Sequence, residues 1–439
     1  MKVSVIVPMY NSQTTLEACL DALGASEYPD CEIIVVDDSS TDASLEIARK
    51  FPVSLVELEG GPGGPAHARN QGVQIAQGEL LLFLDSDVLV YPDTISRIVR
   101  AFQADPSVAA AFGSYDENPS HRDFLSQYKN LIHYFTHQDG VEQAETFWCG
   151  CGAVKREVFQ EIGGFDAGRY PAPSIEDIDF GYRLCAAGYS IRLLKDVQVK
   201  HLKQWSLKSL IKTDIFNRAV PWTHLILRQR NLPNTLNLNM TQRLATFVLL
   251  LLLLQLGLFI FQPNLLVLPF LTILFMCSAA SWHWMDGAPQ LELNESLERS
   301  IYAFIAIIVL LSLWNGQSHL ITVFAVFLPL FLLAQLLVNA QAAVRYLLYI
   351  SITVLFAIEF VILLASYPLL LTIPLLVYLS VIIMLNHRFY RFLLQKRGIL
   401  FAVAAVPMQL LYYLYSFATF AIVTIIHTWS TRIHRKHVS

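Results

Sequence analysis

Seven long apolar segments fill the second half of this 439-residue chain and limit what it can fold into more than any other feature. They cover residues 245–261, 265–284, 301–314, 319–338, 346–366, 368–385 and 399–426. Several reach the length of about 20 residues that a helix needs to cross the hydrocarbon core of a bilayer. We therefore expect residues 244–426 to form a helical transmembrane domain of about six to eight spans.

Charge is distributed unevenly about this boundary. From Leu244 onward the chain has nine Lys or Arg and five Asp or Glu, whereas the residues before Leu244 have 22 and 30. The turns at 262–264, 315–319 and 366–368 carry no Lys or Arg, while the connections between pairs of segments do. Because positive charge stays on the cytoplasmic side, we expect helical hairpins, a cytoplasmic front domain and a basic cytoplasmic tail at 427–439. This organisation is typical of an integral protein of a bacterial-type inner (plasma) membrane.

The last apolar segment leaves the number of spans open. A cytoplasmic domain and a cytoplasmic tail require an even number of spans, yet seven segments are apolar. Residues 399–426 are long, tyrosine-rich and contain Pro407. They fit either a bent hairpin or a segment that lies at the membrane surface.

Residues 1–230 alternate between strand and helix patterns. The runs at 2–10, 31–40, 53–58 and 80–87 are typical of strands, and the stretches at 14–25, 41–51 and 65–77 are typical of helices. This βαβαβαβ series predicts an α/β fold with a doubly wound, Rossmann-like and mostly parallel sheet. Because the carboxyl ends of parallel strands meet at one crevice, we expect these strand-end residues to lie together: Pro8, Tyr10, Asp37, Asp38, Asp85 and Asp87.

Two acids, Asp85 and Asp87, directly follow the apolar run Leu80–Leu84. Carboxylates are costly to bury unless they are paired, hydrogen-bonded or bound to a metal. They could cap the turn that follows, but a cap needs only one carboxylate. We therefore favour a metal and phosphate site. The glycine-rich loop at 59–64 lacks the spacing of a dinucleotide fingerprint, and the helix after it could face an anionic ligand.

Six motifs together resemble a known family. They are "VSVIVPMYN" (3–11), "VVDDSSTD" (35–42), "ARNQG" (68–72), "LDSDV" (84–88), "GGFD" (163–166) and "EDIDFGYRL" (176–184). In this order and at this spacing they resemble the nucleotide-diphospho-sugar transferases of glycosyltransferase family 2, over about the first 225 residues. The resemblance implies a GT-A fold and a nucleotide-diphospho-sugar donor.

The resemblance also implies roles at the donor site. Tyr10, beside Pro8, would flank the nucleotide base, and Asp38 would accept a hydrogen bond from a ring N–H. Arg69 would lie near the base or the phosphates. Asp87 would coordinate Mn²⁺ or Mg²⁺ on the diphosphate, with Asp85 on the ribose or in the metal shell, since hard divalent ions take carboxylate and phosphate oxygens. His201 matches a position near the metal.

On the acceptor side, Glu176 and Asp177 match the family's pair of acids. One carboxylate, for which we favour Asp177, would deprotonate an acceptor hydroxyl as it attacks the anomeric carbon. A single direct displacement inverts that centre. The same acids also suit the N-terminus of a helix, whose dipole favours negative charge, and both interpretations can hold.

A basic, aromatic segment at 203–222 predicts an interfacial helix, extending over about 203–225, where the soluble domain meets anionic lipid. Within it, Arg218 and Trp222 resemble, imperfectly, the Q-x-x-R-W element of processive polysaccharide synthases. The Gln and the adjacency of Arg to Trp are absent, which favours transfer of a single sugar.

The sequence thus predicts an inverting, metal-dependent glycosyltransferase that moves one sugar to a hydroxyl acceptor held at the membrane, either a lipid-linked glycan or a glycolipid. Three alternatives stay open: a polyprenyl-phosphate glycosyltransferase, a processive polysaccharide synthase, and a nucleotide-sugar-binding export subunit without catalysis. Nothing in the sequence indicates nucleic-acid binding.

Overall fold

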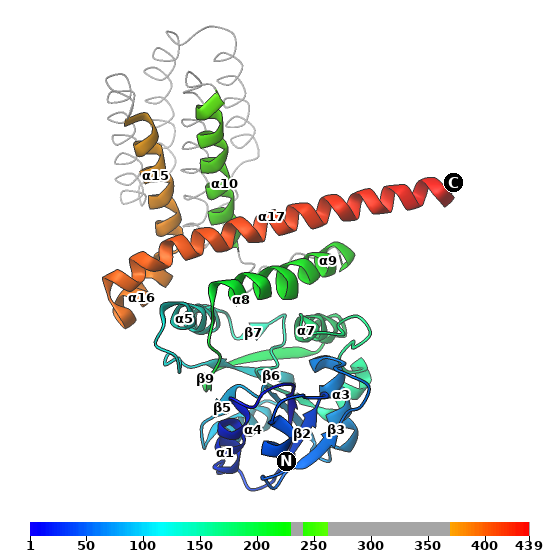
Figure 1. The fold of residues 1–439 in the computed structure, drawn as a ribbon. Coiled ribbons are helices and arrows are strands. Elements are labelled where there is room, and N and C mark those ends of the chain that lie inside the picture. The colour runs from blue at the N-terminus through cyan, green and yellow to red at the C-terminus, as the bar shows by residue number, and fades with distance from the viewer. Residues whose placement is uncertain (230–239, 262–368, 439) are drawn as a thin grey trace. The chain divides into compact units, whose positions relative to one another are not determined.

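The computed structural model describes residues 1–229, 240–261 and 369–438 (Figure 1). The chain forms two compact units, Met1–Asn239 with Arg388–Ser439, and Met240–His387. The sequence pattern assigned 399–426 to the membrane half, whereas the structure groups the helices after His387 with the N-terminal residues. The predicted segments at 265–284, 301–314, 319–338 and 346–366 lie outside the described residues.

The first unit is built on one nine-stranded sheet with the order β3-β2-β1-β4-β8-β6-β9-β5, and β7 pairs with β9. The strands are β1 Val3–Met9, β2 Cys31–Asp37, β3 Ser54–Glu57, β4 Leu80–Leu84, β5 Val88–Val90, β6 Val108–Tyr115, β7 Gln143–Ala144, β8 Cys151–Lys155 and β9 Ser190–His201. The four strands expected from the sequence are all present, as β1 to β4.

The prediction of a mostly parallel sheet was wrong for its second half. Four neighbouring pairs are parallel (β1–β2, β1–β4, β2–β3 and β6–β9) and four are antiparallel (β4–β8, β6–β8, β5–β9 and β7–β9). The chain passes from β4 to β5 through only Asp85–Asp87, with no helix to carry it back across the sheet. The open edge of β4 is filled instead by β8, which runs the opposite way.

Helices cover both faces of the sheet. They are α1 Leu16–Gly24, α2 Ser44–Ala48, α3 Pro65–Ile75, α4 Thr94–Ala104, α5 Phe124–Asp139, α6 Arg156–Ile162 and α7 Glu176–Ala186. Alternate residues of β4 enter opposite cores: Leu80, Leu82 and Leu84 pack with α1 and α4, while Leu81 and Phe83 pack with α3, α6 and α7. All five are buried. The apolar run is therefore a strand covered on both faces, as its sequence predicts.

A second layer of helices belongs to the same unit. It comprises α8 Leu207–Lys212, the π-helix η1 Thr213–Ala219, α9 Val220–Gln229, α16 His387–Arg397 and α17 Ile399–Val438. The interfacial helix predicted at about 203–225 corresponds to α8, η1 and α9. The segment expected at 399–426 is one continuous helix that includes Pro407 and runs beside η1 and α9 (Figure 1).

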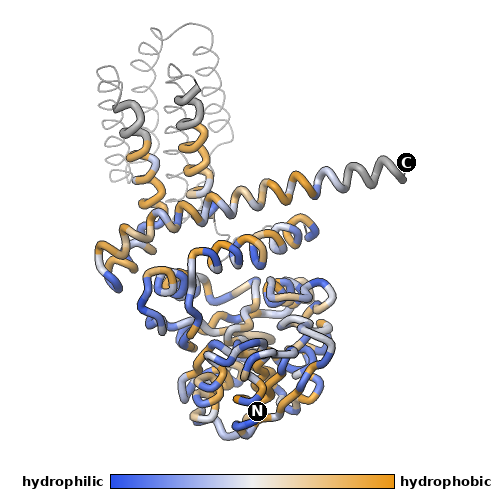
Figure 2. The backbone as a smooth tube through the Cα atoms, in the orientation of Figure 1, coloured by the Kyte–Doolittle hydropathy of each residue, from blue (hydrophilic) through white to orange (hydrophobic). Residues whose placement is uncertain are grey.

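The described part of the second unit consists of α10 Met240–Phe261 and α15 Leu369–Leu385, which pack against each other. Both are strongly apolar, as is α17 (Figure 2). Among the described residues, one helix has the length and hydropathy to cross a bilayer, Ile399–Ser430, with 32 residues and a mean hydropathy of 1.6. The apolar stretches Met240–Leu254 and Leu375–Leu385 are shorter.

Gly181 allows α7 to approach the backbone of the segment before β8. A Cβ atom at this position would lie 2.3 Å from the backbone nitrogen of Phe147. We predict that Gly181→Ala lowers the stability of the first unit by about 1–3 kcal/mol, measured as a lower Tm. The control is Gly24→Ala, where a Cβ atom would meet no heavy atom within 4 Å. Equal melting of both variants would contradict the prediction.

Candidate active site

The ends of β2, β1 and β4 lie side by side, as the sequence predicts. Parallel pairing places Pro8 beside Val36 and Met9 beside Asp37, and β4 flanks β1 on its other side. Tyr10 follows β1 and is 47% exposed, so its ring is available for stacking on a planar ligand. Asp38 follows β2 and is buried. The strand ends therefore form one edge that is lined by an exposed aromatic ring and several acids.

Asp38 organises the glycine-rich loop. One carboxylate oxygen accepts a hydrogen bond from the backbone N–H of Gly63 at 2.9 Å, and the other accepts from Gly64 at 2.8 Å. Gly64 has a φ of +85°, and a Cβ atom there would lie 2.7 Å from the carbonyl oxygen of Pro171. Its lack of a side chain thus permits both the turn and the close approach. The resemblance implies that Asp38 faces a nucleobase, and in the structure both of its oxygens accept hydrogen bonds from this loop.

Arg69 of α3 joins the two acidic motifs. Its buried guanidinium donates from Nη2 to Asp85 Oδ1 and from Nη1 to Glu176 Oε1, each at 2.8 Å. Asp85 follows β4 and Glu176 begins α7, so these acids, 91 positions apart in sequence, share one cation. The sequence placed Arg69 near a ligand; the structure gives it this bridge between strand and helix.

Asp87 and His201 form a second pair. Antiparallel pairing sets Val88 opposite His201, which brings His201 Nε2 to 3.5 Å from Asp87 Oδ2. Burial raises the pKa of Asp87, but the hydrogen bond and charge of His201 outweigh this and lower the pKa below its usual value. The His201 ring stacks on Tyr115 at a centroid distance of 4.2 Å. Tyr115 had no signal in the sequence, because only the pairing of β6 with β9 brings it here.

The pair Asp87–His201 fits a divalent metal only together with a ligand. Within residues 1–229, 240–261 and 369–438, no group of three or more His, Cys, Asp or Glu side chains is arranged to hold a metal ion. Neighbouring ligands of an octahedral ion at about 2.1 Å lie about 3 Å apart, close to the 3.5 Å observed between Asp87 and His201. The remaining oxygens would come from a phosphate-bearing ligand and water, with Asp85 in the surrounding shell.

Asp177 is the acid best arranged to exchange a proton. Glu176 Oε1 binds Arg69, and Glu176 Oε2 accepts from the backbone N–H of Ser174. Among the residues that the structure describes, Asp177 instead accepts only from backbone N–H groups, those of Ile178 at 2.8 Å and Cys149 at 3.2 Å. Burial, followed by the charge of Glu176, raises the pKa of Asp177 to about 7. The side chain can therefore take up a proton near neutral pH.

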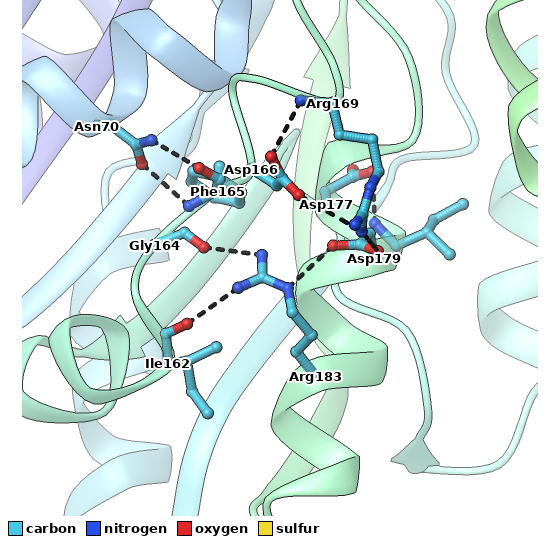
Figure 3. A network of polar contacts seen from close by, with 10 residues as sticks. Asn70, Ile162, Gly164, Phe165, Asp166, Arg169, Asp177, Asp179 and Arg183 are labelled. Atoms are coloured by element: carbon cyan, nitrogen blue, oxygen red, sulfur yellow. Dashed lines mark hydrogen bonds and ion pairs between the residues drawn. The ribbon is translucent and has the colours of Figure 1, made fainter. Parts of the chain in front are cut away.

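A polar network fixes the start of α7 (Figure 3). Arg183 donates to Asp179 Oδ2 and to the carbonyl oxygens of Ile162 and Gly164. Asn70 of α3 donates to the carbonyl of Phe165 and accepts from its N–H. The motifs "ARNQG", "GGFD" and "EDIDFGYRL" are thus bonded to one another. Asn70 and Arg183 had no signal in the sequence, because the backbone groups that they bind lie 95 residues from Asn70, and 21 and 19 residues from Arg183.

Arg218 and Trp222 have separate surroundings. The Trp222 indole N–H donates to the Tyr182 hydroxyl at 3.0 Å, so it packs α9 against α7. Arg218 Nη1 lies 3.2 Å from His133 Nε2, and the His133 ring lies 5.9 Å from the Tyr115 ring. The Arg218 side chain is 38% exposed. Through His133 and Tyr115, Arg218 adjoins the Asp87–His201 pair, whereas Trp222 contacts α7.

Comparison with known proteins identifies one family. Residues 4–163 match Glycosyl transferase family 2. A poly(ribitol-phosphate) beta-glucosyltransferase of Bacillus spizizenii is 40% identical over 104 residues, 22% of this chain and 16% of that protein. The chain thus matches less than a fifth of the length of this relative.

Solved structures were also found. The mannosyltransferase PcManGT from Pyrobaculum calidifontis, in complex with GDP-Man and Mn²⁺, is 23% identical, with a TM-score of 0.43 over 72% of this chain and 81% of that chain. S. aureus TarS 1-349, in complex with UDP-GlcNAc, is 24% identical, with a TM-score of 0.37 over 47% of this chain and 60% of that chain.

We predict that Arg69→Met destabilises the first unit by about 3–5 kcal/mol, because it leaves two carboxylates without their buried cation. Without Arg69 the two acids are protonated more easily, so the deficit relative to the parent chain shrinks as the pH falls. Thermal unfolding between about pH 5 and 8 measures both effects.

The matched control is Arg49→Met. Arg49 pairs with Glu57 at 2.9 Å, but the two side chains are 56% and 46% exposed, so its loss should cost about 0.5 kcal/mol or less. Equal losses in the two variants, or a deficit of Arg69→Met that grows on acidification, would count against the buried bridge.

Proposed function

Because residues 4–163 match Glycosyl transferase family 2, we propose that the protein is an inverting, metal-dependent glycosyltransferase with a GT-A-like fold. It moves a single sugar from a nucleotide-diphospho-sugar to a hydroxyl acceptor held at a membrane, such as a lipid-linked glycan or a glycolipid. The observation that carries this proposal is the Arg69 bridge, since it holds the strand end with Asp85 against the helix start with Asp177. Donor and acceptor groups would meet between them.

The donor side uses the strand ends. The exposed ring of Tyr10 would flank the nucleotide base, next to Pro8. Asp38 would act mainly through the loop that it holds, whose backbone N–H groups precede α3. Mn²⁺ or Mg²⁺ held by Asp87 and His201, with Asp85 nearby, would neutralise the charge that grows on the leaving diphosphate. Arg218, with its positive charge on the same side, would help to hold the diphosphate.

The acceptor side uses α7. Asp177 would accept the proton of the acceptor hydroxyl while the hydroxyl oxygen attacks the anomeric carbon. The bond from that carbon to the diphosphate oxygen breaks in the same step. Glu176, paired with Arg69, would position its neighbour rather than take the proton. A direct displacement inverts the anomeric centre. Trp222, bonded to Tyr182, would keep the membrane-side helix α9 against the acceptor helix.

The proposed membrane location rests on the helices of the second layer and on the apolar segments of the second half of the chain. The chain's hydropathy and the basic helices α8 and α16 support an acceptor held in lipid, with the catalytic domain in the cytoplasm. Transfer to polyprenyl phosphate is the main alternative. Its phosphate oxygen is already an anion and needs little help from Asp177.

We expect nucleoside-diphosphate release by the nanodisc-embedded protein to require a sugar donor, Mn²⁺ or Mg²⁺, and a membrane lipid extract. The assay uses a panel of UDP-, GDP- and dTDP-sugars, with EDTA as the metal-free arm. Asp87→Asn and Asp177→Asn should each lower release by roughly 10²-fold or more. Glu46→Gln, on the exposed face of α2, serves as the control. Metal-dependent nucleotide binding without release would instead indicate an export subunit, and a polymeric product a processive synthase.

The pH dependence tests the role of Asp177. Because its pKa is raised to about 7 and the deprotonated form acts as base, kcat/KM should rise about tenfold per pH unit below pH 7 and level off above it. Steady-state rates with the donor found above measure this profile. A flat profile, together with near-parent activity of Asp177→Asn, would reject the base and favour a phosphate acceptor.

A further inference from the structure

The long helix α17 has two faces of different character. One face packs on the first unit through buried residues that recur along the helix: Ala402, Ala405, Gln409, Tyr413, Thr419 and Val423. The opposite face is apolar and exposed. Val403, Leu414 and Ile425 are 60%, 42% and 64% exposed. They recur every eleven residues, close to three helical turns, and so form one stripe.

The packed face holds α17 along its length. The Phe401 ring lies 4.9 Å from that of Phe124 in α5. Farther along the helix, the Tyr415 hydroxyl donates to Asp214 of η1 at 2.6 Å, and the His427 ring lies 6.3 Å from that of His224 in α9. These contacts extend over 26 residues, or about 39 Å at 1.5 Å per residue. A helix attached to one domain over this distance cannot also leave it to cross a bilayer.

The hydrogen bond from Tyr415 to Asp214 belongs to a buried polar cluster. Asp214 is buried, and its carboxylate also accepts from Lys129 Nζ at 2.7 and 2.8 Å. Buried charges of this kind are stable only with their partners in place. The middle of α17 is therefore fixed to η1 and α5 by a polar cluster, in addition to apolar packing.

The positive charge at both ends of α17 also argues against a helix that crosses the membrane. "HRFYRFLLQKR" (387–397) precedes the helix and "TRIHRKH" (431–437) closes it, while residues 360–439 contain no Asp or Glu. Positive segments stay on the cytoplasmic side of a membrane, so a crossing helix would place one basic end on the wrong side. The same charges complement anionic lipid headgroups. Trp429, 69% exposed, is of the type enriched at membrane interfaces.

We propose that α17 lies along the cytoplasmic membrane surface, with the stripe of Val403, Leu414 and Ile425 in the boundary between headgroups and acyl chains of an anionic leaflet. The helix is attached to lipid on one face and to the catalytic unit on the other. This inference rests on the proposed membrane location and specifies how the catalytic unit is held there. It also removes 399–426 from the spans.

Two-sided labelling tests the orientation. Gln395→Cys, before α17, and Ser439→Cys, after it, are expressed separately in the full chain. A membrane-impermeant maleimide is applied to intact cells and to inverted membrane vesicles, and labelling is read above that of the parent chain. We expect both positions to react in inverted vesicles and neither in intact cells. Reaction from opposite sides would show a span and overturn the proposal.

Lipid contact is tested by depth-dependent quenching. The Ile425→Cys variant is labelled with an environment-sensitive fluorophore and placed in liposomes of phosphatidylethanolamine and phosphatidylglycerol. One set of liposomes contains a lipid with a nitroxide near its headgroup, and a second set contains a lipid with a nitroxide near the end of its acyl chain. The shallow nitroxide should quench more than the deep one. The matched control is Ile75→Cys on α3, 45% exposed, which should be quenched by neither.

Two outcomes would overturn the proposal. Maximal quenching by the deep nitroxide indicates a crossing helix, and no quenching at position 425 indicates that protein, such as a second copy, covers the stripe. Nucleoside-diphosphate release is measured separately on the same vesicles. If the shallow nitroxide quenches more but no nucleoside diphosphate is released, only the proposed function is rejected. If nucleoside diphosphate is released but the deep nitroxide quenches more, only the surface position of α17 is rejected.

Discussion

The bridge made by Arg69 is the interaction on which the arrangement of the site depends. Two carboxylates on different elements, Asp85 after β4 and Glu176 at the start of α7, are held within hydrogen-bond distance of one buried guanidinium. The planar fork of Arg suits two acceptors in fixed directions, which a lysine ammonium does not. The acids would otherwise repel one another across the sheet edge. The cation makes their proximity stable, while burial and the charge of Glu176 raise the pKa of the neighbouring Asp177.

Much of the first half of the fold could be predicted from the sequence. The β1–β4 strands and the helices between them follow from local periodicity, and the residues at the ends of β1, β2 and β4 gather where parallel strands require. The antiparallel half could not be predicted in this way. It depends on β8 filling the edge beside β4, which is a pairing between segments about 70 residues apart. Such pairings leave little local signal, because an edge can accept a strand in either direction.

The candidate site was predictable to a similar extent. The acidic residues could be identified, because a carboxylate next to a buried strand costs free energy unless it is paired, hydrogen-bonded or bound to a metal. Their partners could not be found in the same way. Tyr115 reaches His201 only through the pairing of β6 with β9, and Asn70 reaches Phe165 only because α3 packs near the loop before α7. The resemblance implies a ligand-binding role for Asp38, and the structure adds that both of its oxygens accept hydrogen bonds from backbone N–H groups of the loop.

The first unit is assembled from two separate stretches of chain, with the apolar segments between them. Tyr128 and Leu131 of α5 are buried partly by Phe389 and Leu393 of α16. During synthesis, the N-terminal residues leave the ribosome with this side of α5 uncovered. Residues 240–387 must follow before the helices that complete the packing are made. The first unit is therefore completed only after residue 388 has been made, so that a chain released earlier would expose an apolar surface for quality-control factors to recognise.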